Sequence, residues 1–444
     1  MALGFFYLIA VLIFAIAAIV VLTVKFRVHA FFALILACFV VGLGIQMPFA
    51  DILGLVKEGF GNIMKSLSLI IILGTTLGVL LEHSGSTSVM AGYILRKVGE
   101  GKASFSLSLT GLIGGLPLFC DSGYMVLNGL NKPLAKRTGL SIATLSVCLS
   151  TGLYAVHCLL PPHPGASAAA GTIGVDLGKL ILIGFLVSVP AMLIGYVWAV
   201  YAGKQYADVI ELEHENVVEE RTNKPSVLKS FLPVIVPILL IALRSGFSLD
   251  ANKSDGMTDL IFVVGEPAFA LSIGVLLALM NIGKTKKGGL NQILEDSISK
   301  AGVILVIIGA GGSFGAVLAA ANIGESFQNA LPLAGLGIAF PFILTFILKT
   351  AQGSSTVAII TAGSIVLPLL PAMGLDHADG KLLTVLSMGA GSMMISHAND
   401  SYFWVIAKFS GLNMRAMLRV YSTATLLMGL ISFLTVYLLS LFLL

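Results

Sequence analysis

The stretch VHCLLPPHPGASAAAG, residues 156–171, ends a long apolar run and decides how the rest of the chain is interpreted. Pro161, Pro162 and Pro164 cannot donate backbone hydrogen bonds, so a helix that enters this stretch must stop there. The helix that begins after Pro164 presents free amides whose partial positive charge suits an anion. We predict a broken helix at a ligand-binding gap, where His163 could bind a carboxylate or carry a proton. His157 fits a packed helix residue better.

The sequence around this stretch is too apolar for a soluble protein. Hydrophobic residues make up 57% of the chain and charged residues 11%, whereas soluble domains carry about 25% charge. Apolar runs repeatedly reach the ~18 residues that can cross a bilayer as a helix. We predict an all-α integral membrane protein with about ten transmembrane helices, near residues 4–24, 28–47, 66–82, 140–162, 178–202, 230–245, 260–281, 300–320, 381–406 and 416–443.

Two further apolar stretches, 103–139 and 333–374, are interrupted near their centres by Gly, Pro, Ser and Asn. Interrupted backbone at membrane depth must be buried in protein or line a cavity, because lipid cannot satisfy free backbone groups. We predict two re-entrant hairpins. Lys and Arg concentrate in cytoplasmic loops, and placing Lys25 and Arg27 inside puts 19 of the 26 basic residues there. Both termini are then periplasmic, the first hairpin is cytoplasmic and the second external.

The two halves of the chain resemble each other. SLIIILGTTLGVLLEHSG (68–85) echoes GVILVIIGAGGSFGAVLAAANIG (302–324), and each is followed by an interrupted hairpin and a His-containing break. Each half holds five spans, so the second must be inverted, as in many secondary transporters with a midplane site. We predict repeats at 1–203 and 230–444, joined by a cytoplasmic linker at 204–229.

The first hairpin carries LPLFCDSGYMVLNGLNKP, residues 116–133. A carboxylate at membrane depth is costly and marks a functional site. Asp121, Tyr124 and Asn128 would share one face of a helical arm, and we predict that Asp121, Ser122 and Asn128 bind substrate. A helix-capping role for Asp121 is the structural alternative.

The second hairpin carries ILKTAQGSSTVAIITAG, residues 347–363. Lys349 lies too deep to reach the interface and needs an anionic partner, either the substrate or Asp400. The tip that follows it offers flexible backbone and three hydroxyl groups for a polyhydroxy anion, at Gly353, Ser354, Ser355 and Thr356. Packing of small residues is the alternative.

The ninth span is broken at SMMISHANDSYFWVIAKFSG, residues 392–411. We predict that His397 and Asn399 contact the substrate. Proton coupling needs a buried group that changes charge, and Asp121 and Asp400 both qualify, so the sequence leaves the choice open. A structural cap is the alternative for Asp400.

Other function classes find little support. GAGGSFG (309–315) lies within an apolar span and follows no strand, so it indicates helix packing and not a nucleotide site. The four cysteines lie in apolar segments without metal-ligand spacing, and the basic residues form short clusters between spans. We expect no cofactor, no metal, no nucleic acid and no enzymatic activity.

At HCLLPPHPG (157–165), QGSSTVAIITAGSIVLPLL (352–370) and SHANDSYFW (396–404) the sequence resembles the gluconate permease (GntP-type) family of proton symporters, within the ion-transporter superfamily. The resemblance runs along essentially the whole chain. It implies proton symport of gluconate or a related sugar acid in a bacterial inner membrane, by a homodimer. The family's first hairpin more often has an aromatic pair, an acid and small apolar residues. FCDSGYMVLNGLNKP (119–133) is more polar, which leaves the substrate open.

Alternatives from the same superfamily are a Na⁺-coupled carboxylate carrier and a proton-coupled importer of a hydroxy amino acid such as D-serine. The first hairpin lacks the Ser-Asn-Thr tip that a Na⁺-coupled carrier would need. A channel fits less well, because broken repeats suit alternating access better than an open pore.

Overall fold

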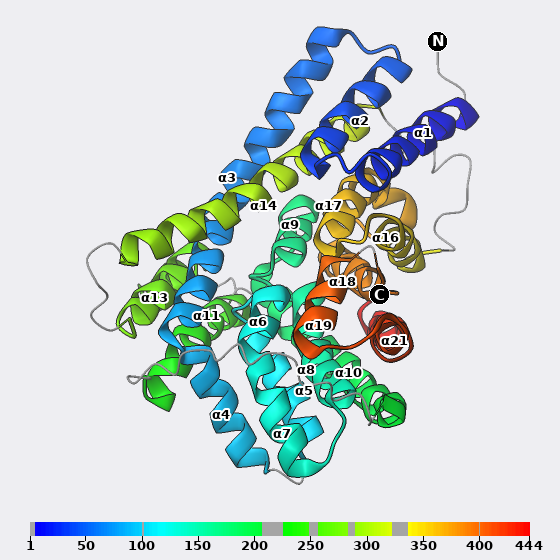
Figure 1. Cartoon of the computed structure of the whole chain (residues 1–444). Coiled ribbons are helices and arrows are strands. Elements are labelled where there is room, and N and C mark those ends of the chain that lie inside the picture. Colours follow the sequence, from blue (N-terminus) through cyan, green and yellow to red (C-terminus); the bar gives the residue numbers. More distant parts are fainter. Residues whose placement is uncertain are drawn as a thin grey trace.

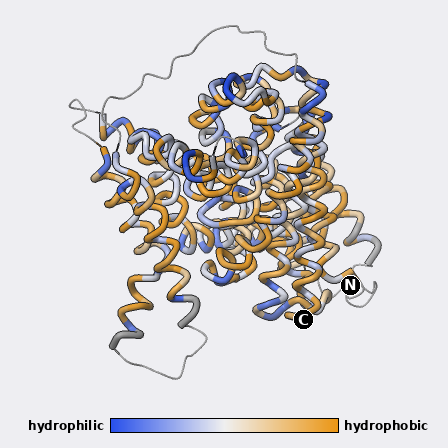
Figure 2. Tube along the Cα trace, turned by 90° about the horizontal axis from the view of Figure 1, so that it is seen from below, coloured by the Kyte–Doolittle hydropathy of each residue, from blue (hydrophilic) through white to orange (hydrophobic). Residues whose placement is uncertain are grey.

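The computed structural model describes residues 5–99, 102–206, 225–247, 256–282, 289–321, 336–398 and 400–444. Within these ranges every regular element is a helix and none is a strand, which confirms the predicted all-α class. Six helical stretches are long and apolar enough to cross a membrane: Phe49–Ser84, Ile142–Ile173, Leu177–Tyr206, Val227–Arg244, Gly289–Ala320 and Met414–Leu443. Hydrophobic residues dominate the chain trace (Figure 2).

The helices of the first half follow the order that the sequence predicts. They are α1 (Phe5–Val24), α2 (Ala30–Gly44), α3 (Phe49–Ser84), α4 (Ser86–Val98), α5 (Ala103–Gly115), α6 (Cys120–Leu127), α7 (Asn131–Thr138), α8 (Ile142–Leu159), α9 (Pro164–Ile173) and α10 (Leu177–Gly203). Short 3₁₀ turns follow α6 at Asn128–Leu130 and α10 at Lys204–Tyr206. The predicted linker at 204–229 falls mostly outside the described residues.

The second half begins with α11 (Val227–Phe247), α12 (Gly256–Val264) and α13 (Pro267–Leu279). It continues with α14 (Gly289–Ala320), α16 (Ala339–Gln352), α17 (Ser355–Val366), α18 (Ala378–Met393), α19 (Ser401–Ser410) and α21 (Thr423–Leu443). A short helix, α20 (Met414–Ala416), and a π-helical segment at Met417–Ser422 lead into α21. From α14 onward the described helices share an order with those from α3: a long helix, a helix pair joined by a turn, a broken helix and a long helix. Helices α4 and α7 have no counterpart among the described residues of the second half.

The long helices α3 and α14 pack along each other (Figure 1). Both start well before the predicted spans 66–82 and 300–320, so those predictions were too short. Lys57 and Lys65 did not end the helix because lysine is a good helix former. Gly59 of α3 lies directly against Gly312 of α14, and Ser313 Oγ donates to the Val56 carbonyl over 2.8 Å. The GAGGSFG segment therefore packs helices, as predicted.

The predicted single span at 260–281 is wrong. The structure ends α12 at Val264 and begins α13 at Pro267, with Gly265 and Glu266 between them. Pro267 has no backbone amide and suits the first position of a helix. The Glu266 carboxylate accepts a hydrogen bond from the Phe269 amide over 2.8 Å and caps the new helix. An acid–proline pair inside an apolar run therefore starts a helix here.

Both predicted helix breaks are present. Helix α8 ends at Leu159 and α9 begins at Pro164, with His163 as its N-cap residue. Helix α18 ends at Met393 and α19 begins at Ser401. Ile395, in the second break, has a positive φ of 45°, which a β-branched residue adopts only where its surroundings hold it there.

Each of the two interrupted stretches contains a pair of helices joined by a turn, and in the first stretch α7 follows that pair. In the first, residues 116–119 connect α5 to α6; in the second, Gly353 and Ser354 connect α16 to α17. Gly353 has a φ of +84°, a conformation that glycine adopts without strain. The short helices α6, α9, α17 and α19 lie in the middle of Figure 1, between the α3–α14 pair and α21.

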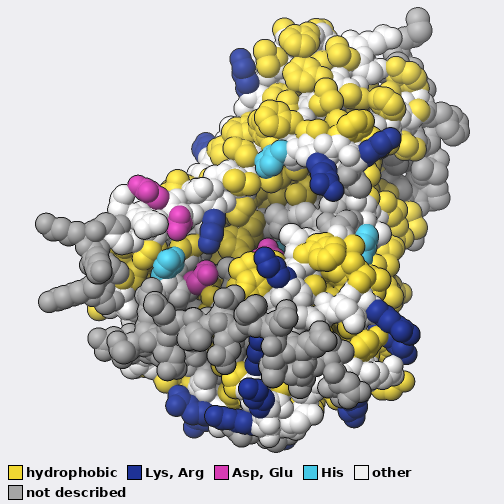
Figure 3. Space-filling view, in the orientation of Figure 1, with side chains coloured by type: hydrophobic (Ala, Val, Ile, Leu, Met, Phe, Trp, Pro, Cys, Tyr) yellow, Lys and Arg dark blue, Asp and Glu magenta, His cyan; other side chains and the backbone are white. Residues whose placement is uncertain are grey.

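The surface seen in Figure 3 is mostly hydrophobic over α1 and α2, whereas Lys and Arg side chains gather at its lower edge, over α4 and α7. Arg96 and Lys97 end α4, and Lys136 and Arg137 end α7. These four residues were predicted to lie on the cytoplasmic side of the membrane.

Candidate functional site

A cavity of about 240 Å³ lies where four helices begin. Cys120, Pro164, Ser355 and Ser401 are the first residues of α6, α9, α17 and α19, and all four line the cavity. Ile304 and Ile307 of α14 form an apolar side. A helix start carries roughly half a positive charge and first-turn amides that need partners. At α17 and α19 one of these amides is already capped, by Ser354 and Asp400.

The turn between α16 and α17 and the start of α17 contribute three of the cavity's four serine and threonine hydroxyl groups. Ser354, Ser355 and Thr356 line it, as does Val357. Ser354 is the N-cap of α17, and its Oγ accepts a hydrogen bond from the Val357 amide over 3.3 Å. Gly165 of α9 packs against the Thr356 backbone, which brings the starts of α9 and α17 close together. The structure thus gathers the predicted hydroxyl cluster at the cavity.

Lys349 is paired with Asp400. The lysine is only 1% exposed, and its Nζ lies 2.6 Å from Asp400 Oδ2. Nζ also donates to the Gly353 carbonyl over 2.5 Å and stands 6.0 Å from the centre of the Tyr154 ring. Of the two partners that the sequence offered for Lys349, the structure shows the carboxylate.

Asp400 combines two structural roles. Its Oδ1 accepts a hydrogen bond from the Tyr402 amide over 3.0 Å and caps α19. Its Oδ2 accepts from Lys349 and, over 2.5 Å, from Ser396 Oγ. Both oxygens are therefore occupied, although the residue lines the cavity.

Asp121 is placed differently. It lies in the first turn of α6 and lines the cavity. Its Oδ1 is buried and has no hydrogen-bond partner in the described part of the chain. Of the two carboxylates that line the cavity, Asp121 is thus the one with an oxygen left to bind a proton or a ligand.

The sequence favoured His163 as the residue at the ligand-binding gap and His157 as a packed helix residue, and the structure places them the other way round. His157 lines the cavity and stacks on Tyr154 with ring centroids 6.3 Å apart. His163 packs against His157 at 5.1 Å and hydrogen-bonds to the Gly115 backbone, outside the cavity lining. His157 Nδ1 and His163 Nε2 are buried without a hydrogen-bond partner among the described residues.

Two other predicted binding residues lie away from the cavity lining. Asn128 Nδ2 donates to the Phe409 carbonyl over 2.9 Å, so it joins the end of α6 to the end of α19. His397 Nε2 lies 3.3 Å from the Thr350 carbonyl, which ties the second break to α16. Asn399 and the side chain of Ser122 lie outside the described residues.

Sequence reasoning missed the aromatic part of the cavity. Phe119, Tyr154 and Tyr402 line it, and Tyr154 and Tyr402 stack with centroids 5.7 Å apart. Tyr402 OH donates to the Ser150 carbonyl over 3.2 Å, which fixes its ring against α8. Only the position of Phe119 and Tyr402 next to predicted site residues could have indicated this.

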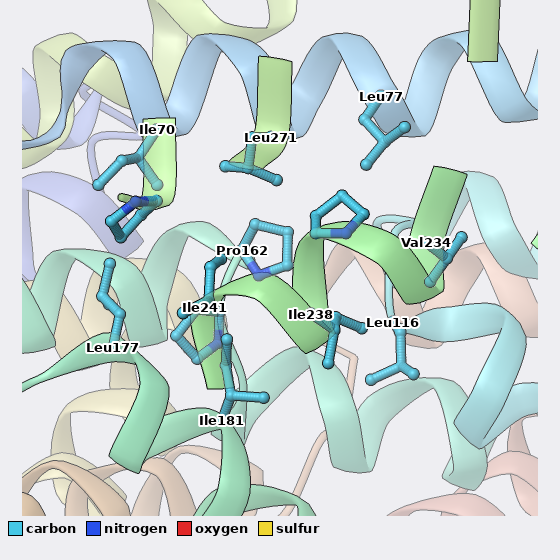
Figure 4. A pocket seen from close by; sticks show the side chains of 13 residues that line it. Ile70, Leu77, Leu116, Pro162, Leu177, Ile181, Val234, Ile238, Ile241 and Leu271 are labelled. Carbon is cyan, nitrogen blue, oxygen red and sulfur yellow. The ribbon is translucent and has the colours of Figure 1, made fainter. Parts of the chain in front are cut away.

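A second cavity, of about 30 Å³, lies behind the first break (Figure 4). Ile70 and Leu77 of α3, Leu271 of α13, Ile238 of α11 and Pro162 face into it. Every residue that lines it is apolar, so it offers nothing to hold an anion.

Comparison with known proteins identifies the family. Residues 7–442 match the family described as GntP family permease. The gluconate permease of Pseudomonas aeruginosa is 31% identical over 446 residues, which cover 98% of each chain. The D-serine transporter DsdX of Escherichia coli O6:H1 is 31% identical over 442 residues, also 98% of each. The Gnt-II system L-idonate transporter of Escherichia coli K12 is 28% identical over 436 residues, 95% of this chain and 97% of the relative.

Two solved transporters share the fold at low sequence identity. The Alcanivorax borkumensis YdaH transporter superposes with a TM-score of 0.61 at 16% identity, over 89% of this chain and 90% of that one. Neisseria gonorrhoeae MtrF, described as illuminating a class of antimetabolite efflux pumps, gives a TM-score of 0.56 at 16% identity, over 86% and 83%. The fold is that of a membrane transporter.

Proposed function

This chain belongs to the GntP family of permeases, and from that premise we propose that it is a proton symporter of a small hydroxylated organic anion such as gluconate or a related sugar acid. The observation that carries the proposal is the meeting of four helix starts at one cavity. Helix N-termini bind anions through free amides and the helix dipole. Broken helices of transporters use this device for substrate carboxylates.

The cavity suggests how such a substrate lies. Its carboxylate meets the helix starts at Cys120, Pro164 and Ser401, and its hydroxyl groups meet Ser354, Ser355 and Thr356. Hydrogen bonds to charged groups contribute about 1.5–3 kcal/mol each, so the carboxylate anchors the ligand. The aromatic rings of Phe119, Tyr154 and Tyr402 pack against the carbon chain.

For coupling, the structure favours Asp121 over Asp400 as the proton carrier. Asp400 has a cation and two other donors on its oxygens, which leave neither oxygen free for a proton. Asp121 Oδ1 has no such partner. A proton on Asp121 removes the repulsion between this carboxylate and an incoming anion, so proton and substrate bind together.

We further propose the finer architecture. The chain has ten spans and two re-entrant hairpins, α5–α6 and α16–α17, in oppositely oriented repeats. It is a multi-pass protein of a bacterial inner membrane with periplasmic termini, and it works as a homodimer. The repeated element order and the clustered basic residues of α4 and α7 support this arrangement.

A hydroxy amino acid such as D-serine is the second candidate substrate. The free Oδ1 of Asp121 could accept from an ammonium group while the helix starts hold the carboxylate. The similarity to the D-serine transporter DsdX supports testing this candidate.

Uptake into proteoliposomes tests both candidates. We expect accumulation of gluconate or another sugar acid under an inwardly directed proton gradient, and none under a Na⁺ gradient alone. Uptake of D-serine without any sugar acid would favour the second candidate. Accumulation that needs Na⁺ and ignores pH would contradict proton symport.

A further inference from the structure

The Lys349 ammonium is held by two oxygen atoms of kinds that also bind metal cations. A backbone carbonyl (Gly353) and a carboxylate (Asp400) contact Nζ directly, and the face of the Tyr154 ring lies 6.0 Å away. The Ser396 hydroxyl reaches the same carboxylate oxygen. Carbonyl, carboxylate and hydroxyl oxygens are the ligands that hard cations prefer.

The Lys349 ammonium also lies at a junction between two parts of the fold. Gly353 ends α16 at the turn into α17, and Asp400 caps the start of α19. The ammonium therefore joins the turn of one helix pair to the break of another helix. Both sides present negative charge, the carbonyl end of α16 by its dipole and Asp400 by its carboxylate, so a positive charge between them is required.

We propose that the Lys349 side chain takes the place of a soluble monovalent cation such as Na⁺ at this junction. A tethered ammonium occupies the site permanently, so the second half of the protein needs no ion from solution. Removing the side chain should create a cation site lined by the Gly353 carbonyl and the Asp400 carboxylate. This inference does not rest on the identity of the substrate.

The test measures thermal unfolding of the purified full-length protein in NaCl, LiCl, ethylammonium chloride or choline chloride. Lys349→Ala removes the ammonium and leaves room, so its midpoint should fall in choline and rise again by several degrees in Na⁺ or ethylammonium. Lys349→Met fills the space, so it should be destabilised equally in all four salts. The wild-type midpoint should not depend on the cation.

Two controls separate a cation site from general effects of salt. Lys381 forms an exposed ion pair with Asp376 over 2.9 Å, and Lys381→Ala should show no cation-specific change. Lys349→Ala combined with Asp400→Asn lacks the carboxylate ligand, so it should not respond to Na⁺.

Several outcomes would overturn the proposal. One is a Lys349→Ala midpoint that is the same in Na⁺, ethylammonium and choline. Another is a Lys349→Ala protein that stays unfolded in every salt while Lys349→Met with Asp400→Asn folds. That result would mean that charge neutralisation alone suffices. A wild-type midpoint that rises specifically with Na⁺ would place the soluble cation elsewhere. Substrate uptake enters none of these measurements, so they stand or fall apart from the proposed transport.

Discussion

The same junction is built in both halves of the protein, with different chemistry. In the first half the N-cap residue of α9, His163, hydrogen-bonds to the backbone of Gly115, the last residue of α5. In the second half the N-cap residue of α19, Asp400, reaches the end of α16 through Lys349. One junction is thus a single hydrogen bond and the other a buried ion pair, so the second should depend far more on its two partners.

The largest effect should follow from breaking the ion pair. Asp400→Asn leaves the Lys349 ammonium buried without its counter-charge, which costs about 3–5 kcal/mol of folding free energy. Chemical unfolding in detergent measures this loss. Lys349→Met with Asp400→Asn removes both charges and should recover most of it. If Asp400→Asn alone is as stable as the wild type, the ion pair does not hold the second junction.

Asp121→Asn should abolish coupling while sparing the fold. The variant cannot carry a proton, so proteoliposomes should exchange substrate but not concentrate it under a pH gradient. Its unfolding free energy should change by less than about 1 kcal/mol, because among the described residues no ion pair of Asp121 would be lost. Concentrative uptake by Asp121→Asn would rule out Asp121 as the carrier and leave Asp400 or the His157–His163 pair, where each ring has a nitrogen without a partner among the described residues.

The first junction should break more gently. His163→Ala loses the bond to Gly115 and leaves a small void, so we expect a cost of about 1–3 kcal/mol. His163→Gln keeps a polar group near the Gly115 backbone and should recover part of that cost. The unfolding free energies of both variants, measured together with that of Asp400→Asn, compare the two junctions directly. If His163→Ala costs as much as Asp400→Asn, the two junctions are equivalent after all.

Asn128→Ala should have the smallest effect. Asn128 donates an exposed hydrogen bond to the Phe409 carbonyl and accepts one from Asn131 Nδ2, so we expect a loss of about 1–2 kcal/mol. Substrate affinity, measured by isothermal titration with gluconate or the substrate found by uptake, should be unchanged. A tenfold weaker affinity would return Asn128 to the binding site that the sequence predicted for it.

Local chemistry made the breaks predictable, and long-range packing limited the rest. Pro161, Pro162 and Pro164 forbid a continuous helix whatever surrounds them, so the first gap could be located from sequence. The prediction for Asn128 assumed one continuous helical arm, whereas α6 ends at Leu127, a 3₁₀ turn follows, and Asn128 contacts the Phe409 carbonyl outside the cavity lining. Tyr154 had no local signal, since only the fold brings it beside Lys349 and Tyr402.

The lengths of the short helices carry an electrical consequence. Helix α9 has 10 residues and α19 also has 10, so each is about 15 Å long, half of a ~30 Å hydrocarbon layer. In the proposed arrangement, with these helix starts at the midplane, a bound ligand has crossed about half of the membrane field. For a monovalent anion entering a cell that is negative inside, that field opposes binding by roughly 1 kcal/mol per 100 mV. A proton taken up on Asp121 cancels this charge, so the loaded site should form almost independently of voltage.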